Sequence, residues 1–260
     1  MNILVLLCGI ADPKLPLPRD INALALDSLR AAHPLLSPFD EAALELALKL
    51  RDADPTVHIT AVVPVSSTTD PLLRTVASLR LDQTFGLDIQ HIPSWNSLGV
   101  AHACAAAVST LDPLPSLVLI GREFGDCDDG TTTACIAQAL GMAYSKLVFS
   151  IAIENVHIHA VRQNGARQER VRLPLPAVAS VTNDARSKLR HPLLKNVMVA
   201  KKMTFKMIDL SEPIPGNVQL TALAAAPVRT RATTCRMLPG NAQMQANVLA
   251  ELLLAHGSAR

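Results

Sequence analysis

The sequence predicts a three-layer α/β/α fold, in which helices cover both faces of a mostly parallel sheet. Two observations point to this class. Apolar runs of strand length alternate along the chain with helical patterns long enough for crossover connections, which is typical of repeated βαβ units. Hydrophobic residues make up 49% of the chain but aromatic residues only 3%, so the core must consist mainly of Leu, Val, Ile and Ala. Such a core suits a sheet that is buried between helices.

The first part of the chain is expected to alternate strands with helices. Residues 3–7 form a continuous apolar run, which is typical of a buried parallel strand. Ser37 then precedes Pro38, and Asp40 stands where it can complete a capping box, so a helix is predicted from residue 38 to about residue 52. Further strands are predicted at 57–63, 85–89 and 117–120, and further helices at 70–79, 96–111 and 131–141.

The pattern changes after Tyr144. Strands are predicted at 147–153, 156–161, 169–173 and 177–181, and the last of these is expected to return to the main sheet. A turn is expected at Gln163-Asn164-Gly165. The predicted division places an α/β domain at residues 1–205 and a C-terminal part at 206–260. That part contains an extended Pro- and Ala-rich arm (213–237), suited to lie on a partner, and a helix at 243–256.

Composition and charge exclude several classes of protein. The net charge of +2 gives the whole chain no strong preference for nucleic acid or for an anionic membrane. The five cysteines show no C-x-x-C spacing, which argues against a disulfide framework and a zinc site and favours a reducing cytoplasm. No apolar stretch approaches the length of a membrane span, so we expect a soluble protein.

The stretch from residue 116 to residue 141 is the strongest candidate for a ligand site. A predicted strand ends at Gly121, and a predicted helix begins after a polar loop, so the N–H groups of the helix could receive a phosphate at the carboxyl edge of the sheet. Carboxylates in this loop oppose a phosphate unless they point away, hold a ribose, cap the helix or bind a cation. On this stretch alone, an ordinary helix capped by Asp and Thr side chains is favoured over a nucleotide site. The polar residues concerned are Asp126, Asp128, Asp129, Gly130, Thr131, Thr132 and Thr133.

Residues 183–206 form a basic segment with three possible interpretations. A solvated face is the simplest. A protein-docking loop is the second, because leucines could supply an apolar anchor while the lysines attract an acidic partner. Nucleic acid is less favoured, since Phe205 is the only ring available for stacking. The cations are Arg186, Lys188, Arg190, Lys195, Lys201, Lys202 and Lys206, against Asp184 alone, and the leucines are Leu189, Leu193 and Leu194.

Motifs for other chemistry are weak. His157 and His159 share one face of a predicted strand, but no third metal ligand can be named, so an exposed pair is favoured and no metal is expected. The sequence contains no G-x-S-x-G, no P-loop and no G-x-G-x-x-G after a strand. Its acids and histidines form no recognisable acid/base set.

Six stretches, in this order and at this spacing, together resemble the β subunit of electron-transfer flavoprotein over the whole chain. The six stretches are an opening strand and loop (3–12), the helix start Ser37-Pro-Phe-Asp-Glu (37–50), a nucleotide loop (121–132), and three later signatures (175–178, 194–202 and 227–230). The second and the fifth of these are the most specific.

The resemblance implies a Rossmann-like, adenine-nucleotide-hydrolase-like domain in a heterodimer with an α subunit. It implies an electron carrier rather than an enzyme, which passes electrons from dehydrogenases of the acyl-CoA type to a quinone-linked acceptor. FAD would be shared with the α subunit, and AMP would lie inside this chain. Carried over by position, the AMP site comprises Leu6, Ser37, Pro38, Phe39, Asp40, Pro64, Gly121, Arg122, Asp126, Asp128, Gly130, Thr131 and Thr132. Partner docking is carried over to Leu194 as the anchor, with Lys195, Lys201 and Lys202 around it.

The chain departs from the family pattern at the nucleotide site. Cys8 stands where the family has a lysine, Pro64-Val65 replaces a turn of small residues, and Gly130-Thr131-Thr132 replaces Asn-Gln-Thr. Two alternatives remain open. An electron-bifurcating form would hold a second FAD in place of AMP, although Thr132 stands where bifurcating members tend to have valine. A stand-alone adenine-nucleotide sensor of the universal-stress type would share the sheet, but its glycine-rich phosphate loop is absent here.

Overall fold

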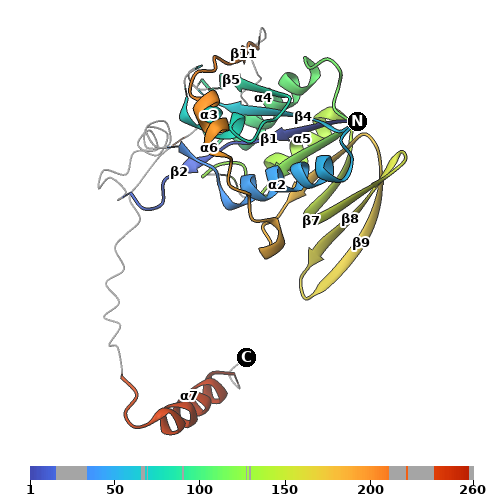
Figure 1. The fold of residues 1–260 in the computed structure, drawn as a ribbon. Coiled ribbons are helices and arrows are strands. Elements are labelled where there is room, and N and C mark those ends of the chain that lie inside the picture. Colours follow the sequence, from blue (N-terminus) through green and yellow to red (C-terminus); the bar gives the residue numbers. More distant parts are fainter. Residues whose placement is uncertain are drawn as a thin grey trace. The chain divides into compact units, whose positions relative to one another are not determined.

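The fold is organised on a single nine-stranded sheet (Figure 1). The computed structural model describes residues 1–15, 34–65, 68, 70–89, 91–126, 128, 130–210, 221 and 237–257. The strands follow one another across the sheet in the order β11 (Lys206–Ile208), β5 (Gln83–Leu87), β4 (His58–Pro64), β1 (Asn2–Leu6), β6 (Leu117–Gly121), β10 (Ala177–Val181), β7 (Ala143–Glu154), β8 (His157–Asn164) and β9 (Arg167–Pro174). Neighbours from β11 to β7 pair in parallel, which confirms the predicted mostly parallel sheet.

The strands after Tyr144 all belong to this sheet. The sequence placed only the last of them there, and β10 does return between β6 and β7. However, β7, β8 and β9 continue the same sheet as an antiparallel extension at one edge (Figure 1). The predicted turn joins β8 to β9 at Gly165, whose φ of 58° suits glycine. A separate small ladder pairs β2 (Ile10–Ala11) with β3 (Pro34–Leu35).

Helices cover both faces of the parallel part, as predicted. Side chains alternate along β1, so Ile3, Val5 and Leu7 lie in one core with α2 (Pro38–Ala53) and α3 (Pro71–Ala77). Leu4 and Leu6 point to the other face, where they pack with α4 (Ser97–Ser109) and α5 (Thr132–Leu140). The three-layer architecture is confirmed.

Local capping signals explain where these helices begin and end. Ser37 Oγ accepts a hydrogen bond from the Asp40 N–H at 3.0 Å, and the Asp40 carboxylate accepts one from the Ser37 N–H at 3.0 Å, so the predicted capping box is confirmed. Asp70 caps α3 through the Leu72 N–H at 2.7 Å. Gly141 ends α5 with a φ of 63°, as predicted.

The order of connections creates a switch point between β1 and β6. The chain moves outward from β1 to β4 and then to β5 through α2 and α3, and α4 carries it back to β6 on the other side of β1. The loops that follow β1 and β6 therefore leave the sheet in opposite directions. In open α/β sheets ligands bind in the crevice at such a point, outside the carboxyl ends of the strands.

After β10 the chain crosses the α2/α3 face to reach the opposite edge of the sheet. It forms a short 3-10 helix η1 (Ala185–Ser187) and α6 (Leu194–Ala200), which contacts α3, and then ends this passage in β11 beside β5. Strand β11 lies just past the predicted domain boundary at residue 205 and is nevertheless part of the sheet.

The chain divides into two compact units, residues 1–223 and residues 224–260, which are described separately. The second unit contains α7 (Ala242–Gly257), close to the predicted helix at 243–256. Most of the predicted arm at 213–237 lies outside the described residues, and its placement on a partner stays a prediction. None of the helices in the described part of the chain has the length and apolar character needed to cross a membrane.

Candidate functional site

The switch point brings together segments that are far apart in the sequence. Gly121 ends β6 directly against the first turn of α2. A Cβ atom on Gly121 would lie 3.0 Å from Phe39 Cβ, 3.1 Å from the Phe39 carbonyl carbon and 3.2 Å from the Asp40 nitrogen. Two of these three atoms are backbone atoms, which no side-chain rotation can move. Glycine at this position therefore allows α2 to begin beside the end of β6.

Asp40 joins the start of α2 to the end of β1. Its carboxylate is fully buried and accepts hydrogen bonds from the N–H groups of Cys8 at 3.4 Å and Gly9 at 3.1 Å, in addition to that of Ser37. Burial raises the pKa of Asp40, although the hydrogen bonds from Ser37, Gly9 and Cys8 act in the opposite direction. Gly9 has a φ of 74°, and sequence reasoning did not single it out, although a glycine directly after a strand was a usable signal.

Two acids of the 121–132 loop are turned toward backbone N–H groups. Asp126 accepts a hydrogen bond from the Ala11 N–H at 2.9 Å, so it ties the loop after β6 to the loop after β1. Asp128 accepts hydrogen bonds from the N–H groups of Phe124 at 2.9 Å and Gly130 at 3.0 Å. Of the possibilities left open by the sequence, Asp128 takes the role of helix capping. Asp129 lies outside the described residues.

At the start of α5 the capping side chain is an aspartate and not a threonine. Thr131 occupies the N-cap position, but its side chain makes no capping hydrogen bond. The Asp128 carboxylate instead accepts from the N–H groups of Thr131 at 3.2 Å and Thr132 at 3.4 Å. Thr132 and Thr133 are buried, and Thr133 Oγ1 lies 2.9 Å from the Tyr144 hydroxyl oxygen. The first turn of α5 is therefore held from both sides.

Arg122 supplies the positive charge beside the crevice. Its guanidinium lies over the Phe39 ring, 4.7 Å from the ring centroid, and it forms an ion pair with Glu123 at 2.6 Å. The Arg122 side chain is 42% exposed, so it is accessible to a ligand. The sequence did not identify Glu123, which competes for this cation.

Two positions of the carried-over site lie slightly apart from this group. The Leu6 side chain is fully buried in the core under α4 and α5, so only its backbone can face the crevice. Pro64 ends β4, which neighbours β1 on the side away from β6. The adjacent Val65 is buried in the core on the α2/α3 side, where it packs over Gly86.

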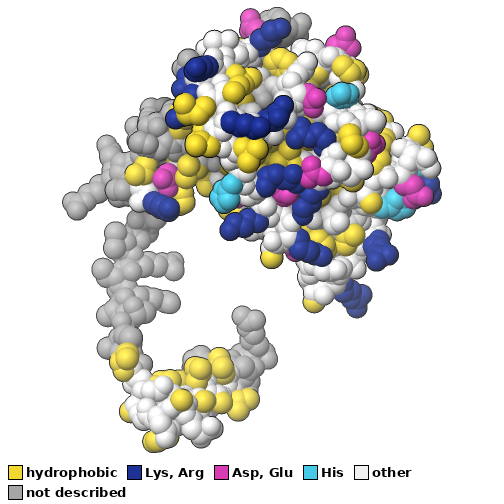
Figure 2. Space-filling view, viewed as in Figure 1, with side chains coloured by type: hydrophobic (Ala, Val, Ile, Leu, Met, Phe, Trp, Pro, Cys, Tyr) yellow, Lys and Arg dark blue, Asp and Glu magenta, His cyan; other side chains and the backbone are white. Residues whose placement is uncertain are grey.

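The docking positions lie on and around α6. Leu194 is 77% exposed, and Lys195, Lys201 and Lys202 are also exposed. Met198, Val199 and their neighbours extend the apolar surface, although sequence reasoning did not name them. The spacing of four residues between Leu194 and Met198 was the available signal. We call Leu193, Leu194, Met198, Val199 and Met203 the α6 patch. Figure 2 shows hydrophobic and basic side chains side by side over the region of α6 and α3.

Comparison with known proteins gives this arrangement a family. The family model described as "Electron transfer flavoprotein domain" matches residues 29–213. The chain belongs to the electron transfer flavoprotein family. Among relatives of this family, the chain is 27% identical over 198 residues to the mitochondrial electron transfer flavoprotein subunit beta of Oryza sativa subsp. indica, covering 75% of this chain and 78% of that protein.

Other relatives carry the same description. The chain is 26% identical over 200 residues to electron transfer flavoprotein subunit beta of Bos taurus, which covers 75% of this chain and 77% of that protein. It is 24% identical over 209 residues to the corresponding subunit of Megasphaera elsdenii, with 78% and 77% covered. The predicted likeness to electron transfer flavoprotein β subunits is confirmed, and so is a role in electron transfer.

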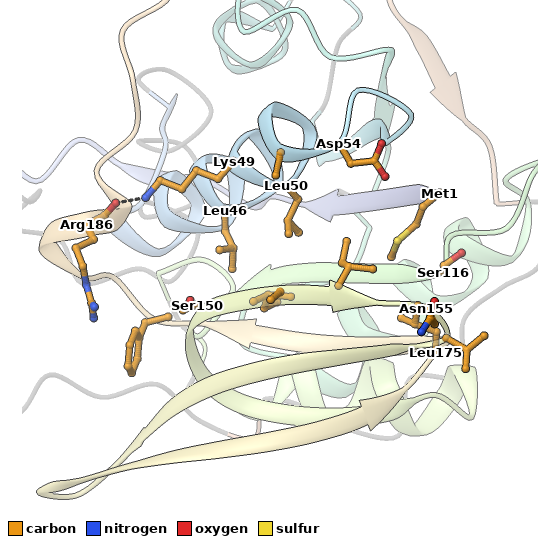
Figure 3. Close-up of a pocket in the computed structure, with 16 residues that line it drawn as sticks. Met1, Leu46, Lys49, Leu50, Asp54, Ser116, Ser150, Asn155, Leu175 and Arg186 are labelled. Atoms are coloured by element: carbon orange, nitrogen blue, oxygen red, sulfur yellow. Dashed lines mark hydrogen bonds between the residues drawn. The ribbon is translucent and has the colours of Figure 1, made fainter.

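A pocket of about 940 Å³ lies between α2 and β7 (Figure 3), and sequence reasoning did not predict it. Figure 3 shows Leu46 and Leu50 pointing from α2 toward the sheet, and apolar residues of β7, Ile151 among them, also line the pocket. The cationic end of the pocket is already engaged, because Lys49 Nζ donates a hydrogen bond to the Arg186 carbonyl oxygen. Arg186 in turn pairs with Asp184 at 2.7 Å.

The histidine pair on β8 has ordinary polar partners. His159 Nε2 lies 2.8 Å from a Glu154 carboxylate oxygen, and His157 Nδ1 lies 3.2 Å from the Arg172 guanidinium. Within the described ranges, no group of three His, Cys, Asp or Glu side chains is placed to hold a metal ion.

Proposed function

We propose that this chain is the β subunit of a heterodimeric electron transfer flavoprotein. It would take electrons from dehydrogenases of the acyl-CoA type and deliver them to a quinone-linked acceptor through one FAD shared with an α subunit. The observation that carries the proposal is the α6 patch, an exposed apolar anchor surrounded by lysines. An electron carrier must bind each partner only briefly. A small apolar anchor with a charged rim attracts and orients the partner without forming a large permanent interface.

FAD, when bound, supplies the redox chemistry, while protein groups position it and adjust its electronics. This chain would present the α6 patch to the donor, and the cofactor would carry out the redox chemistry. A cytoplasmic location and the absence of nucleic acid among its partners stay predictions from composition.

We further propose that the switch-point crevice holds AMP. Two observations support this ligand. The carboxylates of Asp40, Asp126 and Asp128 are all engaged by backbone N–H groups. Val65, whose branched side chain could have crowded an adenine, is buried in the core. The phosphate would be received by Arg122, since the N–H groups of Gly130, Thr131 and Thr132 already donate to Asp128. The nucleoside would lie near Ser37, Phe39 and Pro64.

Leu194→Ala tests the docking role. In the heterodimer co-expressed with its α subunit, we expect this variant to keep its FAD but to take electrons at least about tenfold more slowly from a reduced acyl-CoA dehydrogenase, because an interface anchor is lost. The measurement is stopped-flow absorbance of the flavin. The matched control is Leu114→Ala, since Leu114 is 60% exposed and lies outside the α6 patch. Equal rates for the Leu194 variant and the unmodified protein would contradict the proposal.

A second experiment tests the cofactors. The purified heterodimer is denatured, and the released nucleotides are separated by chromatography and quantified. We expect one FAD and one AMP per heterodimer. Two FAD molecules without AMP would indicate the bifurcating form, and an adenine nucleotide without any flavin would indicate the sensor.

A further inference from the structure

The α6 patch stands on a helix that cannot hold itself in place. Helix α6 has only seven residues, and its N-cap residue Leu193 makes no side-chain capping hydrogen bond. Helices this short are unstable on their own in water, so tertiary contacts must fix them. On the C-terminal side, Ala200 and Phe205 are buried and provide such contacts. The N-terminal side needs an equivalent anchor close to Leu194.

Arg190 provides this anchor. Its Nε lies 3.0 Å and one terminal nitrogen 2.9 Å from the two carboxylate oxygens of Glu45, and its backbone N–H donates to Glu45 at 3.1 Å. The other terminal nitrogen pairs with Asp52 at 2.7 Å. The Glu45 side chain is only 6% exposed and the Arg190 side chain is 40% exposed, so this is a bidentate contact of defined geometry whose carboxylate is buried. The hydrogen bonds to Glu45 raise the pKa of Arg190, which keeps the guanidinium charged.

The surface of α2 is patterned to hold the whole incoming segment. Glu45, Lys49 and Asp52 are separated by four and three residues, so they share one face of the helix. Lys49 binds the Arg186 carbonyl oxygen, while Glu45 and Asp52 bind Arg190. We call these α2 residues together with Arg190 the α2 clamp. The clamp fixes the chain immediately before the exposed stretch that carries Leu194.

We infer that Arg190 is a positioning residue for partner recognition, which acts through Glu45 and Asp52 to hold the α6 patch in its binding orientation. This inference rests on the proposed docking function. Arg190 itself would not touch the donor dehydrogenase. Without the clamp, α6 would sample other orientations, and productive encounters would become rarer while electron transfer within a formed complex stayed the same.

The test uses the heterodimer with Arg190→Leu and Glu45→Gln combined, because removing Arg190 alone would leave a buried unpaired carboxylate and destabilise the fold. Two readouts are compared with Arg167→Leu, which removes an exposed arginine on β9. The first is hydrogen exchange at the amides of Val197 and Lys201, which bond to Leu193 and Val197 carbonyls. The second is the steady-state assay in which an acyl-CoA dehydrogenase reduces the flavoprotein.

We expect faster exchange in α6 and a KM for the flavoprotein raised about tenfold with little change in kcat, with FAD content unchanged. Arg190→Lys should give an intermediate KM, since lysine keeps the charge but loses the bidentate geometry. Unchanged exchange in α6 would overturn the inference, and so would faster exchange with an unchanged KM. The Leu194→Ala variant, with its clamp intact, tests the docking function separately.

Discussion

Asp40→Ala should lower the free energy of unfolding by about 3 kcal/mol, because it leaves the buried N–H groups of Cys8, Gly9 and Ser37 without their carboxylate acceptor. The loss affects two elements at once, the start of α2 and the end of β1. Denaturant titration of the heterodimer or of the single chain measures the change. Asp126→Ala is the matched control, with an expected loss of about 1 kcal/mol because it removes one hydrogen bond at an exposed position. A loss at Asp40 no larger than that at Asp126 would contradict this account.

Asp40 also gives stability a pH dependence with a defined sign. Burial raises its pKa above the ordinary value of 3.8, so the folded protein binds the proton more tightly than the unfolded chain. Its contribution is therefore largest below the unfolded pKa and declines as the pH rises through the folded pKa. Asp40→Asn removes this titration. The free energy of unfolding of the natural protein minus that of the Asn variant should therefore decrease as the pH rises from acid toward neutral. An increase of this quantity with pH would show that the pKa of Asp40 is lowered instead.

Gly121→Ala should cost about 2 kcal/mol and disturb the proposed nucleotide site, because the new methyl group would press against the backbone of Phe39 and Asp40. The start of α2 would have to move away from β6. We expect faster hydrogen exchange at Cys8 and Gly9, whose N–H groups bond to Asp40, and less AMP released from the heterodimer.

Gly141→Ala is the control for this variant. A Cβ there meets no atom within 4 Å, but the φ of 63° disfavours alanine, so a cost of about 1 kcal/mol is expected from the backbone alone. It should leave the exchange of Cys8 and Gly9 unchanged. If Gly121→Ala also leaves that exchange unchanged, the close approach of α2 to β6 is not what shapes the crevice.

Local signals made most of the fold predictable. The capping box at Ser37 and Asp40, the stop at Gly141 and the turn at Gly165 each depend on a few neighbouring residues, and the structure confirms all three. Helix α6 was missed because seven residues carry too little periodicity. The place of β7, β8 and β9 in the main sheet was also missed, because strand order depends on contacts between distant segments.

The sequence predicted which residues gather at the switch point, but not how their side chains are oriented. The family resemblance located the loop acids, yet whether their carboxylates would face a ligand or the backbone depends on the fold of three separate loops. Asp128, rather than Thr131, caps α5, and no local pattern distinguishes these alternatives. The pairing of Glu45 with Arg190 spans 145 positions, so neither residue indicates the other in the sequence.

The division of labour along α2 has a practical consequence for engineering. The first turn of α2 shapes the crevice. The face of α2 that carries Glu45, Lys49 and Asp52 binds the segment that leads to α6. Residues 186–203 could be grafted onto another member of the family in order to transfer donor preference. The grafted segment would lack its supporting contacts unless Glu45, Lys49 and Asp52 were transferred as well. The transferable unit is the segment together with that face of the helix.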